Sequence, residues 1–429
     1  MFIDYEKIGQ TLKLFFPKHS KEIWDYCYEK KIKQNCTYIE KNKKKVFKKL
    51  RKKFGKEPLK VTFYVHDCSK WKSQTIYDLM ANDSRFEPQI IVTKAASKEG
   101  SLNYLNADDL IKTYNFFKNK NMNVAYGYDI ENNKFIPFKK FNPDIIFYGH
   151  PWYVETQQGP VVCSKFALTY YVPYFLANTA LYVEYDLRFH QYLHKHYVLN
   201  SYIKNFYEER QKYKTSNIHA IGHPQLDYFY FNKDKKTENK YVIYAPHWSA
   251  ATTKGICYST FLKTGEYILN FAKKHPEINW IFKPHPVLHI QLTEVSKVWT
   301  KEKWENYCEE WKKIGTLYNT GDYLDLFMDS CALITDCGSF LTEYFLTKKP
   351  VIHLLSDCAY EKNYSVQKIE KSYYQARSIE ELNQYLDEII IKKNDPKKQE
   401  RLETLKELGL ENNYCAKNII NDITRDLNA

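Results

Sequence analysis

The sequence lacks the short motifs that mark several large enzyme classes. It contains no Gly-x-Gly-x-x-Gly, no Gly-x-x-x-x-Gly-Lys-[Ser/Thr] and no Gly-x-Ser-x-Gly. Dinucleotide-dependent dehydrogenases, P-loop kinases and α/β-hydrolases are therefore poorly supported. There is also no Asp-x-Asp pair of the kind that holds a metal-bound nucleotide diphosphate. Lysine, histidine and helix ends must then provide the contacts to any bound phosphate. We expect neither a metal nor a cofactor.

Paired cysteines and long apolar segments are missing as well. The ten cysteines include no Cys-x-x-Cys pair, which argues against a zinc ribbon or a thioredoxin-type site and fits reduced thiols in the cytoplasm. The longest uncharged stretch, residues 166–183, contains Pro173 and Asn178 and is predicted to be a buried strand with its loop rather than a membrane span. The first ten residues are charged and polar where a secretory signal is apolar. We expect a cytoplasmic protein.

The composition is that of a folded, basic protein. In 429 residues there are 64 Lys and Arg against 51 Asp and Glu, a formal net charge of +13, and 44% of the residues are hydrophobic and 17% aromatic. These values exclude a disordered polyelectrolyte and a collagen-like repeat. At roughly 100–200 residues per domain, the length predicts two domains with an extension.

Residues 1–56 are predicted to form a basic helical extension. The segment 41–56 carries ten positive charges and no negative one. Four apolar residues fall on one face of the expected helix, namely Val46, Phe47, Leu50 and Phe54. Such a helix can lie on the anionic inner face of the cytoplasmic membrane, where each Lys or Arg adds on the order of 1 kcal/mol, or it can pack on the next domain by its apolar edge. Nucleic-acid binding is disfavoured because no nucleic-acid module follows.

Residues 57–230 and 241–395 each alternate short apolar segments with amphipathic helices. The expected strands are KVTFYVHD, PQIIVT, MNVAYGYD and NPDIIFYG in the first region and YVIYAPHW, INWIFKPHP, CALITDCGS and KPVIHLL in the second. This alternation predicts an α/β protein with two Rossmann-like, doubly wound domains, and two such domains facing a cleft form the architecture called GT-B. The polar segment 231–240 is the expected boundary, and 396–429 are expected to be C-terminal helices.

In α/β sheets of this kind ligands bind beyond the carboxyl ends of the strands. One such end is formed by residues 332–354, where a strand is expected to end at Asp336, Gly338 and Ser339 to turn the chain, and a helix to begin near Phe340. The unpaired N–H groups at that helix start can bind a phosphate, with the Ser339 hydroxyl as an added donor. In the alternative interpretation, Ser339 only caps the helix.

Two further strand ends of the second domain carry histidine. The segment IFKPHPVL delivers Lys283 and His285, and YAPHWS places His247 at the same topological position on another strand. An ammonium and an imidazole together can hold a diphosphate and stabilise the charge that develops when a phosphoanhydride breaks. His285 can equally be a hydrogen-bonded residue of a Pro-rich loop, and His247 is a candidate second phosphate donor.

In the first domain, His150 follows the strand of DIIFYGHPW. With an unperturbed pKa near 6.5, a neutral imidazole there suits a general base that takes a proton from an acceptor hydroxyl. His66, at another strand end, stays open as a candidate. His190 and His194 are spaced i,i+4 on an expected helix, followed by His196, but no third ligand or HExxH glutamate accompanies them and zinc is disfavoured.

Four motifs in order resemble the CDP-glycerol glycerophosphotransferase family, whose members build teichoic-acid-type polymers. They are IGHPQLDYF (221–229), YAPHW, FKPHP and DYLDLFMDSCALITDCGSFLTEYFLTKKPVIHL. The resemblance implies a GT-B fold and a CDP-glycerol or related CDP-alditol donor bound mainly by the second domain. It further implies that His285 is the donor-side histidine, that Asp336 and Ser339 line the nucleotide-phosphate site, and that Glu343 stands where the family has an acidic residue.

The chain departs from the family in its first domain. The Trp-His-Gly-Thr-Pro motif that carries the acceptor-side base is missing, and YYVPYFL (170–176) stands in its neighbourhood. We therefore expect a transferase that moves glycerol phosphate to a hydroxyl of a capsule or teichoic-acid-like glycan, free or lipid-linked, and releases CMP. The alternatives are a GT-B glycosyltransferase that uses a nucleotide sugar and a non-catalytic scaffold at the membrane surface.

Overall fold

A computed structural model describes residues 3–96, 107–152, 154–176, 187–211, 213, 215–233, 241–252, 257–318, 323–357, 362–411 and 414–429. The chain divides into two compact units. The first comprises Met1–Tyr174, Tyr182–Gln225 and Tyr414–Ala429, and the second comprises Phe175–Leu181 and Leu226–Asn413.

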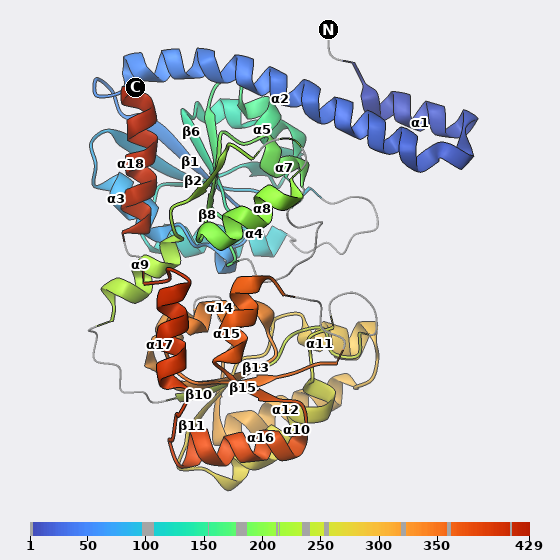
Figure 1. Ribbon diagram of the computed structural model, residues 1–429, viewed down its shortest axis with the longest axis vertical. Helices are drawn as coiled ribbons and strands as arrows, with labels where there is room; N and C mark the ends of the chain where they lie inside the picture. Colours follow the sequence, from blue (N-terminus) through green and yellow to red (C-terminus); the bar gives the residue numbers. More distant parts are fainter. Residues whose placement is uncertain are drawn as a thin grey trace. The chain divides into compact units, whose positions relative to one another are not determined.

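The first unit is built on a parallel sheet of seven strands in the order β3-β2-β1-β6-β7-β8-β9 (Figure 1). These strands are β1 (Leu59–Val65), β2 (Phe86–Val92), β3 (Val124–Tyr126), β6 (Ile145–Tyr148), β7 (Leu168–Tyr171), β8 (Lys195–Val198) and β9 (Ile218–Ala220), and β4 (Tyr128–Asp129) pairs with β5 (Lys134–Phe135) in a separate hairpin. The helices are α1 (Tyr5–Phe15), α2 (Ser20–Lys53), α3 (Gln74–Ala81), α4 (Ala107–Asn119), α5 (Pro160–Cys163), α7 (Arg188–Gln191), α8 (Ser201–Arg210) and α18 (Cys415–Asn428).

Alternate residues of the first sheet enter two different cores. Phe63 and Val65 of β1 pack into a large core with side chains of α2, α3, α4 and α18. Tyr64, between them, packs into a second core with Ile146 and with Cys163 of α5. Because successive side chains of a strand point to opposite faces, both faces of the sheet are covered, as the continuous apolar strands predict.

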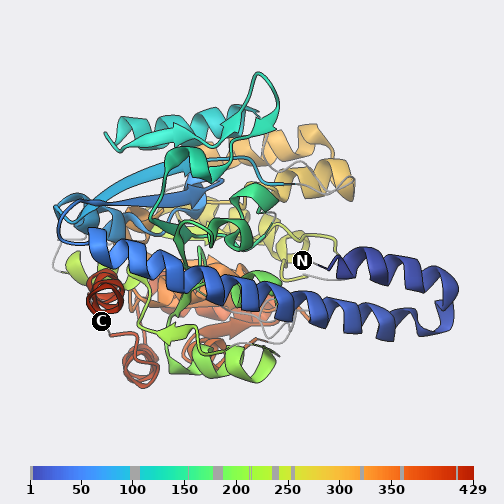
Figure 2. The same ribbon diagram turned by 90° about the horizontal axis from the view of Figure 1, so that it is seen from above.

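The basic extension is helical, as expected, and its apolar edge is buried. Val46 and Leu50 of α2 belong to the large core of the first unit. On the same helix, the ammonium groups of Lys49 and Lys53 lie 3.2 Å and 2.6 Å from the carboxylate of the buried Asp144. Figure 2 shows α1 lying beside the N-terminal part of the 34-residue helix α2. Of the two interpretations of this edge, the structure therefore supports packing on the neighbouring domain.

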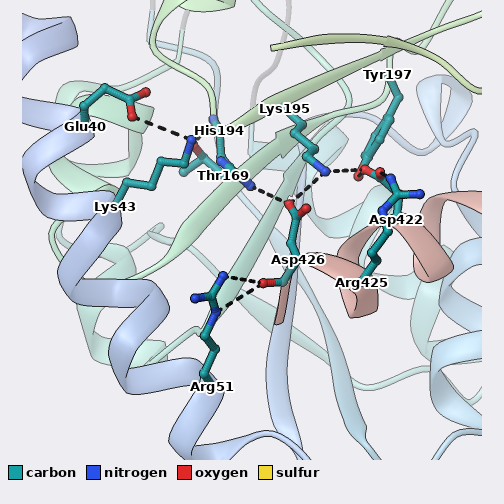
Figure 3. Close-up of polar contacts among 10 residues, drawn as sticks. All are labelled: Glu40, Lys43, Arg51, Thr169, His194, Lys195, Tyr197, Asp422, Arg425 and Asp426. Atoms are coloured by element: carbon teal, nitrogen blue, oxygen red, sulfur yellow. Dashed lines mark hydrogen bonds and ion pairs between the residues drawn. The ribbon is translucent and has the colours of Figure 1, made fainter. Parts of the chain in front are cut away.

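The expected group of C-terminal helices, 396–429, is divided between the units. Helix α17 (Lys398–Glu407) belongs to the second unit and α18 to the first. In Figure 3, Lys195 of β8 lies between Asp422 and Asp426 of α18, at 2.6 Å and 2.7 Å. Arg51 of α2 donates to the carbonyl oxygen of Asp426 (2.9 Å). These contacts attach the last helix to the sheet and to the basic extension.

The second unit contains a parallel sheet of six strands in the order β12-β11-β10-β13-β14-β15. The strands are β10 (Tyr241–Ala245), β11 (Asn279–Phe282), β12 (Gly315–Leu317), β13 (Ser330–Thr335), β14 (Val351–Leu354) and β15 (Tyr374–Ala376). The helices are α9 (Pro224–Phe231), which spans the passage from the first unit, α10 (Phe261–Lys274), α11 (Leu288–Ile290), α12 (Lys301–Ile314), α13 (Leu324–Asp329), α14 (Gly338–Phe345), α15 (Tyr364–Lys371), α16 (Ile379–Tyr385) with a π-helical turn Leu386–Ile391, and α17. Helices α10, α12 and α16 lie on one face of the sheet and α14, α15 and α17 on the other (Figure 1).

Two parallel sheets covered by helices confirm the predicted α/β class. Of the expected boundary 231–240, residues 234–240 lie outside the described residues. Part of the expected loop after β7, residues 177–183, also lies outside them. Among the described helices, none combines the length and the apolar character that crossing a lipid bilayer requires.

Candidate functional site

The strand ends that the sequence singled out in the second unit are neighbours in space. The strands β11, β10 and β13 are adjacent and parallel, so their carboxyl ends meet at one edge of the sheet. Lys283 and His285 follow β11, His247 follows β10, and Asp336 follows β13. We refer to these residues, together with Gly338, Ser339 and Glu343 of α14, as the strand-end cluster.

His247 and His285 form an imidazole pair within the strand-end cluster. Their ring centroids are 5.7 Å apart. The backbone N–H of His285 donates to the carbonyl oxygen of Pro246 (3.1 Å), and this hydrogen bond connects the two loops. The Val287 N–H donates to Nδ1 of His285 (3.2 Å), and the Ser249 N–H donates to Nδ1 of His247 (3.3 Å). Since each Nδ1 accepts a hydrogen bond, each neutral ring carries its proton on Nε2, which is therefore a hydrogen-bond donor.

Burial keeps the first of these rings neutral. His247 is 8% exposed, and burial together with the nearby His285 lowers the pKa of His247 to about 3. Its Nδ1 also lies 2.9 Å from the hydroxyl of Ser249, which accepts hydrogen bonds from the N–H groups of Tyr258 (2.9 Å) and Ser259 (3.1 Å). The ring orientation is therefore fixed by a local network, and His247 presents its Nε2–H near neutral pH.

Asp336 organises the strand-end cluster through backbone hydrogen bonds. One carboxylate oxygen accepts from the His247 N–H (2.6 Å), and the other accepts from the N–H (2.6 Å) and the hydroxyl (3.0 Å) of Thr260. Burial raises the pKa of Asp336 to about 6, against the lowering effect of these hydrogen bonds. Because both oxygens already accept from protein donors, Asp336 positions the His247 loop and the start of α10.

Replacing Asp336 with alanine is expected to destabilise the second unit. The variant leaves the buried N–H of His247 and the N–H of Thr260 without their acceptor, which costs about 1–3 kcal/mol per unsatisfied group. Urea unfolding followed by tryptophan fluorescence measures the change, with Asp357→Ala, at an exposed carboxylate, as the matched control. Equal midpoints for the two variants would contradict the role given to Asp336.

Helix α14 begins at Gly338 rather than near Phe340, so Ser339 lies in the first turn and is not the capping residue. The capping position is Cys337, and within the described part of the chain its side chain makes no capping hydrogen bond. Thr335 fixes the entry to the helix, since its hydroxyl accepts from the Cys337 N–H (2.9 Å) and donates to the Ala245 carbonyl (2.6 Å). The first N–H groups of a helix have no partners inside it, and the dipole there favours an anion.

Lys283 lies among three aromatic rings next to α14. Its ammonium nitrogen is 5.2 Å from the ring centroid of Tyr323 and 5.6 Å from those of Tyr318 and Phe340. Tyr323 also donates a hydrogen bond to the buried carboxylate of Glu343 (2.6 Å). These contacts bring the cation, the acidic residue and the helix start into one neighbourhood.

Sequence reasoning missed several residues that hold the strand-end cluster together. The missed residues are Ser249, Thr260, Tyr318, Tyr323 and Phe340. A signal existed only for Thr260, which directly precedes the apolar helix that begins at Phe261 and occupies its capping position. The aromatic surroundings of Lys283 come from three separate segments, and no spacing rule predicts them.

In the first unit, His150 lines a pocket at the carboxyl ends of β1, β6 and β7. The pocket is also lined by His66, Lys70, Trp71 and Tyr174. The His150 ring stacks on Tyr174 at 5.0 Å and meets the His66 ring edge-to-face at 5.3 Å. Burial, reinforced by His66 and Lys70, places the pKa of His150 well below its ordinary value. The two strand-end histidines of the first domain are thus brought together.

His190, His194 and His196 are buried and contact other side chains of the first unit. The expectation that His190 and His194 share a helix is wrong, because α7 ends at Gln191 and His194 lies in the turn before β8. His194 donates from Nε2 to Asp426 (3.2 Å), and the rings of His190 and His196 stack at 4.9 Å in the interior. Within the described residues, no group of three or more metal-ligating side chains is found.

Comparisons with known proteins identify the family and the fold. The sequence profile of the family described as CDP-Glycerol:Poly(glycerophosphate) glycerophosphotransferase matches residues 11–413. The solved wall teichoic acid polymerase TagF is 12% identical, with 98% of each chain covered and a TM-score of 0.56. The S. aureus MnaA structure with UDP is 12% identical over 86% of this chain and 97% of that one, with a TM-score of 0.55.

A third solved structure, UDP-GlcNAc 2-epimerase from Neisseria meningitidis bound to UDP-GlcNAc, is 11% identical over 86% of this chain and all of that one, with a TM-score of 0.53. A comparison with curated proteins finds no significant match. Two Rossmann-like units of this kind define a protein of the GT-B fold class. The chain belongs to the CDP-glycerol glycerophosphotransferase family and is a transferase by that membership.

Proposed function

We propose that this chain transfers glycerol phosphate, or a similar alditol phosphate, from a CDP-linked donor to a hydroxyl of a capsule or teichoic-acid-like glycan and releases CMP. This is phosphotransferase chemistry. The observation that carries the proposal is the strand-end cluster, in which two imidazoles, one ammonium and a helix start gather at the edge of one sheet in a member of this family. We place the donor diphosphate there.

Each part of the strand-end cluster suits a diphosphate. His247 and His285 have donors at Nε2, and Lys283 supplies positive charge. Gly338 and Ser339 are the first residues of α14, and their backbone N–H groups lie at the helix start. As the acceptor oxygen attacks the β-phosphorus, negative charge grows on the departing CMP, and these fixed donors stabilise it without rearranging. Glu343 acts indirectly, through its hydrogen bond from Tyr323. An imidazole of the first-unit pocket removes the proton of the acceptor hydroxyl, with His150 as the candidate from sequence.

A thermal-shift screen of the full chain tests the donor assignment. A ligand that binds only the folded state stabilises it by mass action and so raises the unfolding temperature. At a ligand concentration of a hundred times the dissociation constant, the free energy of unfolding rises by about 2.7 kcal/mol. We expect CDP-glycerol or CDP-ribitol, and CMP more weakly, to raise the temperature, and uridine or guanosine nucleotides to leave it unchanged. Selective stabilisation by a uridine nucleotide would favour the glycosyltransferase alternative, and no response to any nucleotide would favour a scaffold.

We propose the inner membrane surface as a partner of the basic segment 41–56 through electrostatic contact alone. Its apolar residues Val46 and Leu50 are buried in the first unit and are not available to lipid. The opposite side of α2 presents a shallow surface groove lined mainly by cations, together with Phe47. Such a surface attracts anionic headgroups within about a Debye length. Flotation with anionic vesicles at low and high salt tests the contact, and binding that survives high salt would contradict it.

A further inference from the structure

The loop of residues 67–73, between β1 and α3, forms part of the first-unit pocket. Five of its residues line the pocket, namely Asp67, Lys70, Trp71, Lys72 and Ser73. The loop is held at two points. The Asp67 carboxylate accepts from the Ser69 N–H (2.8 Å), and the hydroxyl of Thr113 in α4 accepts from the Cys68 N–H (3.3 Å). The loop therefore presents its side chains to the pocket from a fixed backbone.

The ammonium of Lys70 makes no ion pair with the side chains that the structure describes. Lys70 is partly buried, and burial lowers its pKa against the opposing effect of the Asp67 charge. The ammonium nitrogen lies 5.4 Å from the ring centroid of Tyr174, which also lines the pocket. A cation that is partly removed from water and has no paired anion is stabilised by a ligand that brings negative charge.

Helix α3 begins at the same pocket. Ser73 occupies its capping position, where a serine hydroxyl normally accepts from a backbone N–H of the first turn. Within the described part of the chain, the Ser73 hydroxyl makes no such bond. Ser73 is nevertheless only 6% exposed, and it lines the pocket. The first N–H groups of a helix have no partners inside it, and the helix dipole favours an anion there, so this hydroxyl and the helix start together suit a phosphate.

The charges that line the pocket sum to a positive value. Among the lining residues that the structure describes, Asp67 supplies one carboxylate against the ammonium groups of Lys70 and Lys72. The two histidines of the pocket add no charge near neutral pH, because burial lowers their pKa values. The rings of Trp71 and Tyr174 give an apolar surface for a carbon chain attached to the anion. The pocket thus matches a ligand with a single negative charge and an organic chain.

We propose that the first-unit pocket binds a phosphodiester group of the acceptor, with the Lys70 ammonium, the Ser73 hydroxyl and the first N–H groups of α3 as its donors. This inference rests on the proposed function and narrows the acceptor that it names. The substrate class is a phosphodiester-linked alditol chain, since a neutral sugar chain has no group that pairs with Lys70. One phosphodiester carries one negative charge, which equals the net charge of the pocket in magnitude.

Binding to the full chain in the absence of any donor tests this site. Isothermal titration calorimetry measures the affinity for three separate probes: a short glycerol phosphate oligomer, inorganic phosphate and glycerol. We expect the oligomer to bind, inorganic phosphate to bind more weakly and to compete with it, and glycerol not to bind. Absence of oligomer binding would overturn the proposal. Inorganic phosphate that binds as tightly as the oligomer would indicate a site for free phosphate and would overturn the assignment to the acceptor.

The variant Lys70→Met removes the ammonium and keeps a flexible unbranched side chain. We expect the dissociation constant of the oligomer to rise about tenfold or more, which is the typical contribution of a hydrogen bond to a charged group. Ser73→Ala is expected to weaken binding by a smaller factor, since a neutral hydroxyl contributes less than an ammonium. The matched control is Lys139→Met, which is expected to bind as wild type. Lys139 is exposed in the 3-10 turn Phe138–Phe141, before the amino end of β6, whereas the pocket lies at the carboxyl end of that strand.

The thermal shift produced by CDP-glycerol distinguishes a failure of this proposal from a failure of the proposed function. We expect that shift to be the same in Lys70→Met as in wild type. An unchanged oligomer affinity in Lys70→Met, or an equal loss in Lys139→Met, would overturn the phosphate site, and a preserved CDP-glycerol shift would leave the proposed function intact. Loss of the CDP-glycerol shift in Lys70→Met would assign the pocket to the donor and overturn the proposal as well.

Discussion

Replacing His285 with alanine is expected to lower turnover at least a hundredfold while the fold persists. His285 provides a donor at Nε2 beside His247 in the strand-end cluster. Removing one preorganised donor from a site where charge develops typically costs on the order of 10²–10³ in kcat. Steady-state rates of CMP release from CDP-glycerol measure the effect, and circular dichroism verifies the fold.

His275→Ala is the matched control for this prediction. His275 belongs to the same unit, directly after α10, and its ring is 28% exposed and paired with Glu277. Its loss is expected to leave turnover unchanged. Rates near wild type for His285→Ala would remove His285 from the donor site, and with it the proposed charge stabilisation of the departing CMP.

Mild acid is expected to destabilise the protein strongly. Burial lowers the pKa values of several histidines: about 4 for His66, His194 and His223, and about 3 for His247. The unfolded chain binds protons at these rings below pH 6.5 and the folded chain does not, so stability falls as the pH falls through 6.5 toward 4. Each ring contributes about 1.4 kcal/mol per pH unit, so the four together remove about 5 kcal/mol between pH 7.5 and 5.5.

The pKa of Asp336 acts with the opposite sign over the same range. Because burial raises that pKa to about 6, the folded state takes up a proton there before the unfolded state does. The resulting stabilisation is less than about 1 kcal/mol at pH 5.5 and offsets only part of the loss. Urea unfolding midpoints at pH 7.5, 6.5 and 5.5 measure the balance. An unchanged midpoint would show that these imidazoles are not buried in the folded protein.

Much of the fold follows from local patterns in the sequence. The strands of both sheets are short apolar segments bounded by polar or Gly and Pro residues, as the alternation in the sequence predicts. What the sequence could not provide is long-range packing. The last helix, α18, returns to the first unit through ion pairs of Asp422 and Asp426 with Lys195, more than 200 positions away, and no local period encodes such a contact.

The candidate site divides in a similar way. Topology alone brings His247, Lys283, His285 and Asp336 to one sheet edge, because parallel strands end together. The function of Asp336 depends on which groups donate hydrogen bonds to its carboxylate oxygens, and the sequence does not show which groups these are. Backbone contacts of this kind leave no trace in residue types.

The proposed reaction breaks the phosphoanhydride of a CDP-linked donor. Phosphorus-31 NMR of the full chain with CDP-glycerol and a glycerol phosphate oligomer follows every phosphorus atom of the reaction at once. We expect one new phosphodiester in the product for each CMP released. Formation of a nucleoside diphosphate, with no new phosphodiester, would contradict it.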